Sequence, residues 1–188
     1  QYFQRHLEEH GVRILSERDG PPEGLADEAD ALVAGTGVTP NIELARAAGL
    51  QTASGVLVDE RLQAAPGIWA VGDIAEYQSV IHGRRLRIEH WDVALNQGGY
   101  VGRTWAGAED GPYDVVPYFF SDLADWTWME YVGPGSGEVE IRGSMAEDSF
   151  VAYYTDETGR LTACLGVNRS DEVEAAKELI RNGAPPPA

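Results

Sequence analysis

A short apolar run that ends in Gly-Asp constrains this chain more than any other feature. The run, Ile68-Trp69-Ala70-Val71, has the length and composition of a buried strand and stops at Gly72-Asp73. A buried strand would place the Asp73 carboxylate at its carboxyl end, where open α/β sheets bind ligands. A carboxylate can accept hydrogen bonds from two sugar-type hydroxyls, which suits a ribose or ribityl chain. Gly-Asp after a strand is also a common turn, so the motif alone leaves both interpretations open.

A long helix is predicted to follow, beginning near Glu89. Glu89-His90-Trp91-Asp92 opens a pattern in which apolar and small side chains recur at spacings of three and four, so they share one helix face. The free N–H groups and the positive dipole at such a helix start favour an anion or a developing negative charge. An aromatic stripe can equally be plain core packing. The predicted face carries Trp91, Ala94, Gly98, Val101 and Trp105.

The charge balance is strongly acidic. The 188 residues include 14 Lys and Arg against 31 Asp and Glu, a formal net charge of −17. Nucleic acid is therefore not expected as a partner, because its phosphates would be repelled. No stretch approaches the roughly 20 apolar residues of a membrane span, and the first ten residues lack a signal-peptide layout, so we expect a cytoplasmic protein without a membrane. The one basic cluster is either a solvated loop or a docking site for an acidic electron carrier; it comprises Arg84, Arg85 and Arg87.

The pattern of predicted elements changes near residue 110. Before it, the chain alternates helices at 1–10 and 41–48 with strands at 12–15, 31–34, 55–58 and 68–71, and an acidic loop spans 17–28. Gly107 to Pro112 breaks this pattern and marks a domain boundary. Beyond it, the residues predict consecutive antiparallel strands and a closing helix capped by Ser170. These strands are expected at 118–120, 126–132, 139–142, 150–154 and 161–167.

Four motifs occur together in an order known from one flavoprotein family. They are Ala34-Gly35-Thr36-Gly37-Val38-Thr39-Pro40-Asn41, Trp69-Ala70-Val71-Gly72-Asp73, Glu89-His90-Trp91 and Tyr118-Phe119-Phe120-Ser121-Asp122. With them the chain resembles the carboxyl-terminal part of the pyridine-nucleotide oxidoreductases, most closely the ferredoxin-reductase and apoptosis-inducing-factor branch. The resemblance implies an α/β fold, in which part of a three-layer FAD/NAD(P)-binding domain precedes a small α+β domain with an antiparallel sheet. The expected divisions are 1–34 for the end of the NAD(P)-binding domain, 35–112 for the end of the FAD-binding domain, and 113–188 for the interface domain.

The resemblance also assigns roles to individual residues. The Gly72-Asp73 carboxylate would hold the flavin ribityl chain, and Glu89, His90 and Trp91 would line the flavin and the nicotinamide. Phe120 stands where the family often has Trp, so it keeps an aromatic surface but lacks the indole N–H. Glu130 matches an acidic position near the nicotinamide amide, and Gly37 a glycine close to the dinucleotide. For each of these residues a structural role in a turn, a helix start or packing is the alternative.

The resemblance implies FAD and NAD(P)H as cofactors and electron transfer from nicotinamide through flavin to an acceptor. The acceptor is a ferredoxin- or rubredoxin-type protein or a small molecule, and a homodimer is a possible assembly. Thiol–disulfide exchange is disfavoured, because no His follows His90 and Cys164 is the single cysteine. No G-x-G-x-x-G unit occurs, so we expect a piece of a longer protein that retains little FAD and is inactive alone. A short chain completed by a partner is one alternative, and a non-catalytic dimerisation or docking module is another.

Overall fold

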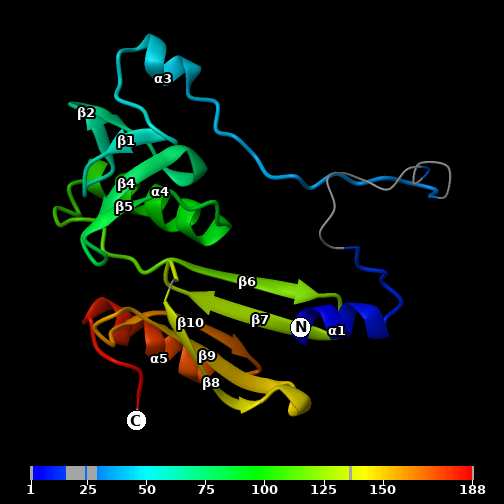
Figure 1. Cartoon of the computed structure of the whole chain (residues 1–188). Helices are drawn as coiled ribbons and strands as arrows, with labels where there is room; N and C mark the ends of the chain where they lie inside the picture. Colours follow the sequence, from blue (N-terminus) through cyan, green and yellow to red (C-terminus); the bar gives the residue numbers. More distant parts are fainter. Residues whose placement is uncertain (1, 16–23, 25–28, 136, 188) are drawn as a thin grey trace. The chain divides into compact units, whose positions relative to one another are not determined.

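The computed structural model describes residues 2–15, 24, 29–135 and 137–187 (Figure 1). The chain divides into two compact units, Gln1–Thr39 and Pro40–Ala188, and each is described by itself. The acidic loop predicted at 17–28 lies outside the described residues, apart from Gly24.

The first unit contains the helix α1 (Tyr2–Glu9), as the sequence predicts, and Gly11 follows it with a φ of 84°. The strands predicted at 12–15 and 31–34 are wrong: both segments are described, and neither forms a strand. Leu32 and Val33 are 60% and 97% exposed, so the latter segment is not buried either. An apolar run becomes a strand only when a neighbouring strand pairs with its backbone N–H and C=O groups, and the described part of this unit supplies none.

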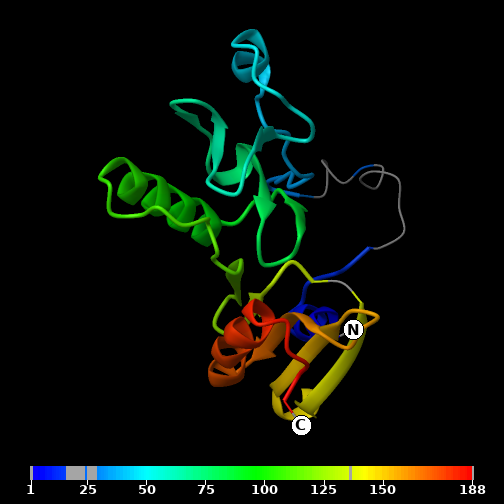
Figure 2. The same ribbon diagram turned by 90° about the vertical axis from the view of Figure 1, so that its left-hand side faces the viewer.

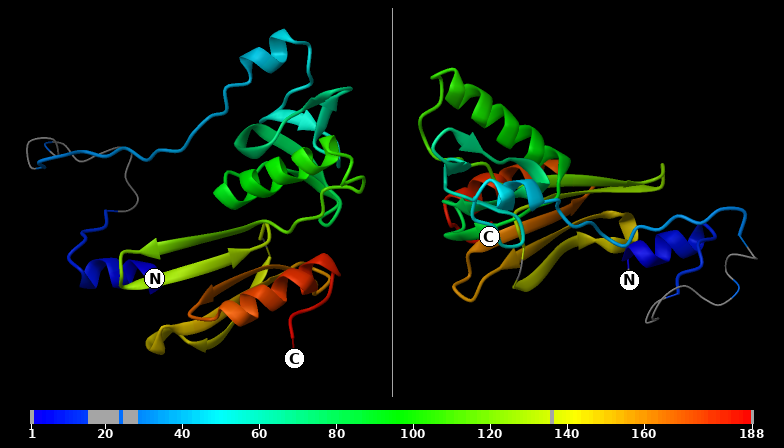
Figure 3. Two further views of the ribbon diagram at one scale, coloured as in Figure 1. Left: turned by 180° about the vertical axis from the view of Figure 1, so that it is seen from behind. Right: turned by 90° about the horizontal axis from the view of Figure 1, so that it is seen from above.

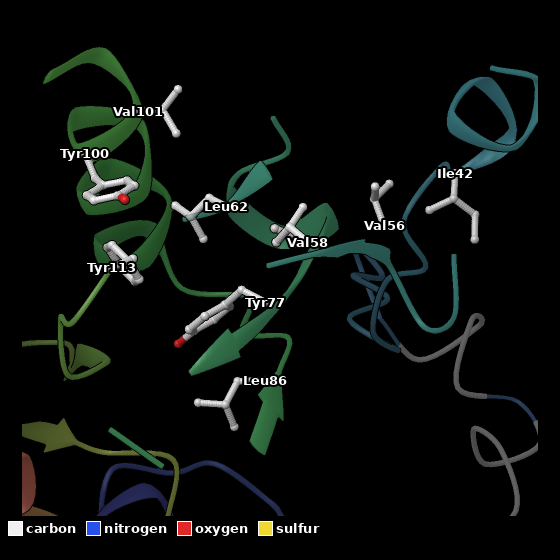
Figure 4. Close-up of a cluster of buried hydrophobic side chains, with 10 residues drawn as sticks. Ile42, Val56, Val58, Leu62, Tyr77, Leu86, Tyr100, Val101 and Tyr113 are labelled. Carbon is white, nitrogen blue, oxygen red and sulfur yellow. The ribbon is translucent and has the colours of Figure 1, made fainter. Parts of the chain in front are cut away.

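A three-stranded sheet forms the first half of the second unit. The helix α3 (Glu43–Ala47) precedes β1 (Val56–Val58), which runs parallel to β4 (Ala75–Ser79), and β4 pairs antiparallel with β5 (Arg84–Leu86). The central strand β4 alternates buried and half-buried positions, so one face carries the core. Figure 4 shows the side chains that fill this core, which include Val56, Val58, Tyr77 and Leu86.

The prediction of a buried strand at 68–71 is wrong. Only Ile68–Trp69 forms a strand, β3, which pairs antiparallel with β2 (Gln63–Ala65) in a separate two-stranded ribbon, and Ile68 is 42% exposed. Pro66 and Gly67, the latter with a φ of 78°, make the tight turn that folds this run back. The chain then enters the short 3-10 helix η1 (Gly72–Ile74), which leads directly into β4. Asp73 therefore precedes the central strand of the three-stranded sheet instead of closing a strand.

The predicted long helix is present as α4 (Trp91–Trp105), but its buried face shares only Val101 with the expected one. Trp91 and Trp105 are 73% and 70% exposed. The reason is that α4 packs through the side chains that face η1 and the three-stranded sheet, and these lie on a neighbouring stripe of the helix. The buried positions are Val93, Gln97, Tyr100 and Val101.

The second half of this unit is a five-stranded antiparallel sheet, as predicted. Its order is β6-β7-β10-β9-β8, and the turn at Asp156–Gly159 joins β9 to β10. The short 3-10 helix η2 (Met145–Glu147) joins β8 to β9. The strands are β6 (Tyr118–Leu123), β7 (Thr127–Val132), β8 (Glu138–Ser144), β9 (Ser149–Thr155) and β10 (Leu161–Val167).

The closing helix α5 (Ser170–Arg181) packs on one face of this sheet, as Figures 2 and 3 show from different sides. Its buried residues Val173, Ala176 and Ile180 join Val132 and Cys164 in a second hydrophobic core. The predicted fold class, a partial α/β redox domain followed by an antiparallel α+β domain, is thereby confirmed. No helix in the part of the chain that the structure describes is both long and apolar enough to cross a membrane.

Candidate functional site

The Gly72-Asp73 turn is fastened to the helix α4. The backbone N–H of Gly72 donates to Oε1 of Gln97 at 2.7 Å, and Gln97 is fully buried. Gly72 has a φ of 73°, and a Cβ on it would lie 3.3 Å from Cβ of Ala94. A side chain at position 72 would therefore meet both an unfavourable backbone conformation and close contact with the helix. The turn holds the exposed Asp73 at a fixed place beside α4.

Arg87 brings Asp73 and Glu89 together. Its Nη1 group donates to the backbone carbonyl oxygen of Asp73 at 3.1 Å and to Oε1 of Glu89 at 2.6 Å. The Asp73 carboxylate itself makes no hydrogen bond or ion pair within the described part of the chain. It is therefore free to accept hydrogen bonds from a ligand. The sequence pattern identifies Arg87 only as a member of a basic cluster, because a sequence does not show which carbonyl oxygen a guanidinium reaches.

The start of α4 offers unused hydrogen-bonding groups. His90 occupies the N-cap position without a side-chain hydrogen bond to the first turn. Its Nδ1 atom is buried and has no partner among the residues that the structure describes. Burial lowers the pKa of His90, and the carboxylates of Asp92, Asp73 and Glu89 offset part of that effect. The imidazole is therefore neutral at neutral pH. Because the His90 side chain does not cap the helix, the first-turn N–H groups remain available to an anion.

A cleft of about 580 Å³ borders Glu89 and His90. Phe119 also lines the cleft and packs on His90, with ring centroids 4.5 Å apart, and Tyr131, another lining residue, lies 5.3 Å from Phe119. Neither Phe119 nor Tyr131 was predicted as a site residue. The alternation of side chains along a strand shows that Phe119 and Phe120 face opposite ways, but not which of them faces the helix.

The structure places Phe120 and Glu130 away from this cleft. They are directly opposite each other on β6 and β7, and neither lines the cleft. Tyr118 donates a hydrogen bond to Oε1 of Glu130 at 2.7 Å, while Oε2 of Glu130 is buried without a partner in the described chain. Burial, with Glu130 adding to it, raises the pKa of Tyr118, so the phenol keeps its proton. Phe120 is 55% exposed.

The predicted site residues thus fall into three groups. Gly72, Asp73, Glu89 and His90 lie together, and Trp91 continues the helix start with an exposed ring that does not line the cleft. Phe120 and Glu130 share a different part of the second unit. Gly37 belongs to the first unit, where it has a φ of 91°. Their roles toward a cofactor stay predictions. No group of three or more His, Cys, Asp or Glu residues suited to a metal ion occurs in the described residues.

An α/β half in which a Gly-Asp turn packs on a helix, followed by an antiparallel sheet covered by one helix, is typical of the class of dinucleotide-dependent oxidoreductases. Comparison with known families agrees. Residues 1–98 match the family described as pyridine nucleotide-disulphide oxidoreductase, and residues 118–188 match the family described as reductase C-terminal. The chain belongs to the pyridine nucleotide-disulphide oxidoreductase family. FAD and NAD(P)H, the predicted cofactors, are confirmed as those of the family.

Two curated relatives are reductases by name, one of ferredoxin and one of putidaredoxin. The chain is 36% identical over 160 residues to the ferredoxin–NAD(+) reductase component of the anthranilate 1,2-dioxygenase system of Burkholderia cepacia, covering 84% of this chain and 39% of that protein. It is 35% identical over 167 residues to putidaredoxin reductase of Pseudomonas putida, covering 87% and 39%. The chain therefore spans about two fifths of the length of these relatives.

Solved structures show the same likeness. The ferredoxin reductase for the CYP199A2 system of Rhodopseudomonas palustris matches with a TM-score of 0.83 and 34% identity, covering 98% of this chain and 49% of that one. The covalent putidaredoxin reductase–putidaredoxin complex matches with a TM-score of 0.75 and 35% identity, covering 84% and 38%. The resemblance to the ferredoxin-reductase branch is thereby confirmed.

Proposed function

We propose that this chain forms the flavin-side turn, the nicotinamide-side helix start and the interface domain of an FAD-dependent NAD(P)H oxidoreductase. The observation that carries the proposal is the meeting of Asp73, Glu89 and His90. Arg87 donates a hydrogen bond of 3.1 Å to the backbone carbonyl oxygen of Asp73 and one of 2.6 Å to the carboxylate of Glu89. The carboxylate charges of Asp73 and Glu89 both act on the pKa of His90. The divisions at 34/35 and 112/113, and a cytoplasmic location, belong to this proposal.

The residues present suit a flavin and a nicotinamide. Asp73 offers an unpartnered carboxylate to the ribityl hydroxyls, and the open first turn of α4 offers N–H groups and a positive dipole to negative charge on the flavin's pyrimidine edge. Glu89 would accept a hydrogen bond from the nicotinamide carboxamide, and the exposed ring of Trp91 would pack on the cofactors and exclude water. Bound FAD supplies the hydride-accepting and electron-donating chemistry, and these residues orient the reactants.

A ferredoxin-type iron–sulfur protein is the proposed electron acceptor. The two curated relatives named above support it, since their names describe ferredoxin and putidaredoxin reductases. Within the basic cluster, Arg85 donates to the carbonyl oxygens of Val58 and Glu76, and Arg87 is engaged with Asp73 and Glu89. Arg84 has no hydrogen bond or ion pair in the described residues, and Arg85 pairs there with neutral carbonyl oxygens alone, so this cluster offers two uncompensated charges to an acidic carrier.

A hybrid protein tests the proposed function. Residues of this chain would replace the matching two fifths of the Burkholderia cepacia reductase component. We expect the purified hybrid to be yellow, with flavin absorbance bands that bleach when NADH is added anaerobically. A hybrid that is folded by circular dichroism yet colourless would contradict the proposal.

The separate core of the carboxyl-terminal sheet favours a second candidate. Val132, Cys164 and Val173 pack in a cluster distinct from the one around Val58 and Tyr77, so the residues from Val116 on have the packing of an autonomous module for dimerisation or partner docking. This candidate predicts that a colourless hybrid still binds the relative's ferredoxin in a pull-down or by calorimetry. A flavin-loaded, NADH-reducible hybrid would favour the enzyme.

A further inference from the structure

Arg87 is built into the fold more firmly than its neighbours in the basic cluster. Its side chain is 21% exposed and crosses the backbone at Gly55. A Cβ on Gly55 would lie 2.9 Å from Cδ of Arg87 and would clash with the carbonyl oxygen of Ile74. Glycine at position 55 therefore leaves the room through which the aliphatic part of Arg87 runs. Packing thus fixes the path of the aliphatic part of Arg87 independently of the hydrogen bonds at its charged end.

The charged end then joins two parts of the proposed site. One nitrogen, Nη1, donates to the Asp73 carbonyl oxygen and to the Glu89 carboxylate. The carbonyl belongs to the turn that Gln97 holds against α4, while Glu89 stands two residues before α4 begins. Charge-assisted hydrogen bonds of this kind restrict a carboxylate strongly. The Glu89 side chain, 36% exposed, would otherwise sample several rotamers in solvent.

We infer that Arg87 is a positioning residue for nicotinamide binding: it holds the Glu89 carboxylate at a fixed place relative to the Asp73 turn, and it offsets the charge of that carboxylate. The inference rests on the proposed function, in which Glu89 contacts the nicotinamide carboxamide. It has a chemical consequence beyond affinity. The nicotinamide ring of NAD⁺ is positively charged and that of NADH is neutral, so an uncompensated Glu89 favours the oxidised form. Arg87 thereby biases the site toward the electron donor NADH and against the product.

The first test is a double-mutant cycle in the FAD-loaded hybrid with its flavin reduced beforehand, so that NADH binds without reacting, and the dissociation constants for NADH and NAD⁺ are measured by fluorescence or calorimetry. Arg87→Gln should weaken NADH binding about tenfold, the size expected for the loss of one charge-assisted hydrogen bond. The same change in a Glu89→Gln background should have little further effect, because Arg87 acts through Glu89. Additive losses from the two substitutions would overturn the inference.

The second readout is the preference between the two nicotinamide forms. In Arg87→Gln the ratio of the NAD⁺ to the NADH dissociation constant should fall about threefold, the effect of one uncompensated, partly exposed charge. Arg87→Lys should restore the ratio, because it returns the positive charge. A ratio that stays at the wild-type value in Arg87→Gln would contradict the charge role of Arg87.

The chain contains a matched control. Arg142 also pairs with a glutamate two positions away, Glu140, at 2.8 Å, but on the strand β8 of the carboxyl-terminal sheet. Arg142→Gln should leave both nicotinamide dissociation constants unchanged. Equal effects of Arg142→Gln and Arg87→Gln would show a general effect of lost charge and overturn the inference.

A measurement on the 188-residue chain without cofactors tests the Arg87–Glu89 pair independently of cofactor binding. In NMR spectra, the side-chain N–H protons of Arg87 should exchange slowly with water, and the carboxyl signal of Glu89 should be narrow because the ion pair restricts its motion. In Arg87→Gln the Glu89 signal should broaden. Rapid exchange of the Arg87 side chain in the wild type would overturn the inference. If the hybrid binds neither FAD nor NADH although the Arg87–Glu89 pair is present, the proposed function fails and the nicotinamide role of Arg87 fails with it.

Discussion

Gln97 is the residue on which the geometry of the Gly-Asp turn depends most. It is a fully buried polar side chain on an otherwise apolar helix stripe, and its Oε1 accepts the hydrogen bond from the Gly72 N–H at 2.7 Å. A buried N–H that loses its acceptor costs more than the hydrogen bond itself is worth. The buried stripe of α4 therefore serves two purposes, packing against the sheet and fixing the residue next to Asp73.

Replacing Gln97 with leucine should destabilise the protein by about 1–3 kcal/mol, because the Gly72 N–H is left buried without an acceptor. The measurement is urea unfolding followed by circular dichroism. Leu95→Ala on the same helix is the control, since Leu95 is 57% exposed and a surface change of this kind is expected to stay within about 0.5 kcal/mol. Equal stability losses in the two variants would contradict the role of Gln97.

His82 makes the stability of the second unit depend on pH. Burial, reinforced by the charge of Arg84, lowers the pKa of this side chain to about 4. In the unfolded chain the imidazole takes up a proton near pH 6.5, whereas in the folded chain it does so only near pH 4. The unfolded state therefore binds more protons in this window, and the free energy of unfolding falls as the pH is lowered from about 6.5 to about 4.

His82→Asn should flatten that part of the stability profile, and urea unfolding at a series of pH values would measure it. Asparagine can still hydrogen bond with Ser79, whose Oγ lies 2.9 Å from His82 Nδ1. Some slope should remain, because the pKa of His90 is also lowered by burial. An unchanged slope in His82→Asn would show that His82 is not the titrating group.

At the scale of elements, helix α4 has one face packed on the sheet and another that carries exposed aromatic rings. The packed face continues into an aromatic cluster in which Tyr113 lies 5.6 Å from Tyr100 and 5.7 Å from Tyr77, measured between ring centroids. The exposed face begins with Trp91 at the helix start and ends with Trp105, which meets Trp69 edge-on at 5.7 Å. The two faces should respond differently to truncation.

Tyr113→Ala should cost about 3 kcal/mol or more, as expected for removing a buried aromatic ring. Trp91→Ala should change the free energy of unfolding by less than about 0.5 kcal/mol, because that ring is 73% exposed. Thermal or urea unfolding compares the two variants directly. A larger loss from Trp91→Ala than from Tyr113→Ala would mean that the predicted face of α4, and not the observed one, carries the core.

Features that depend on neighbouring residues were predicted correctly, and features that depend on distant partners were not. The start of α4, the turn at Asp156–Gly159 and the carboxyl-terminal strands follow from local turn residues and periodicity. The run at 68–71 was misread because the Pro66–Gly67 turn folds it into a ribbon. Arg87 and Phe119 were missed because their roles depend on which residues the tertiary fold brings to them.

At the scale of the whole molecule, the site is spread over elements that are far apart in the sequence. The turn at Gly72 and Asp73, the strand β5 that leads to Arg87, and the helix α4 meet because β4 and β5 form a hairpin beside the parallel strand β1. Both matched segments of the chain contribute to the site, because Phe119 on β6, in the segment 118–188, packs on His90 at the α4 start, in the segment 1–98. A substitution at this contact in either segment should therefore alter the proposed nicotinamide side of the site.

The most direct test of the account is the dissociation constant of FAD from a protein that carries this chain, compared between the wild type and Asp73→Ala. The wild type should hold flavin, and the variant should bind it roughly 10–100-fold more weakly, because it loses charge-assisted hydrogen bonds to two hydroxyls. Asp114→Ala, a substitution outside the turn, should bind FAD as the wild type does. Unchanged FAD affinity in Asp73→Ala would contradict the assignment of the Gly-Asp turn to the flavin.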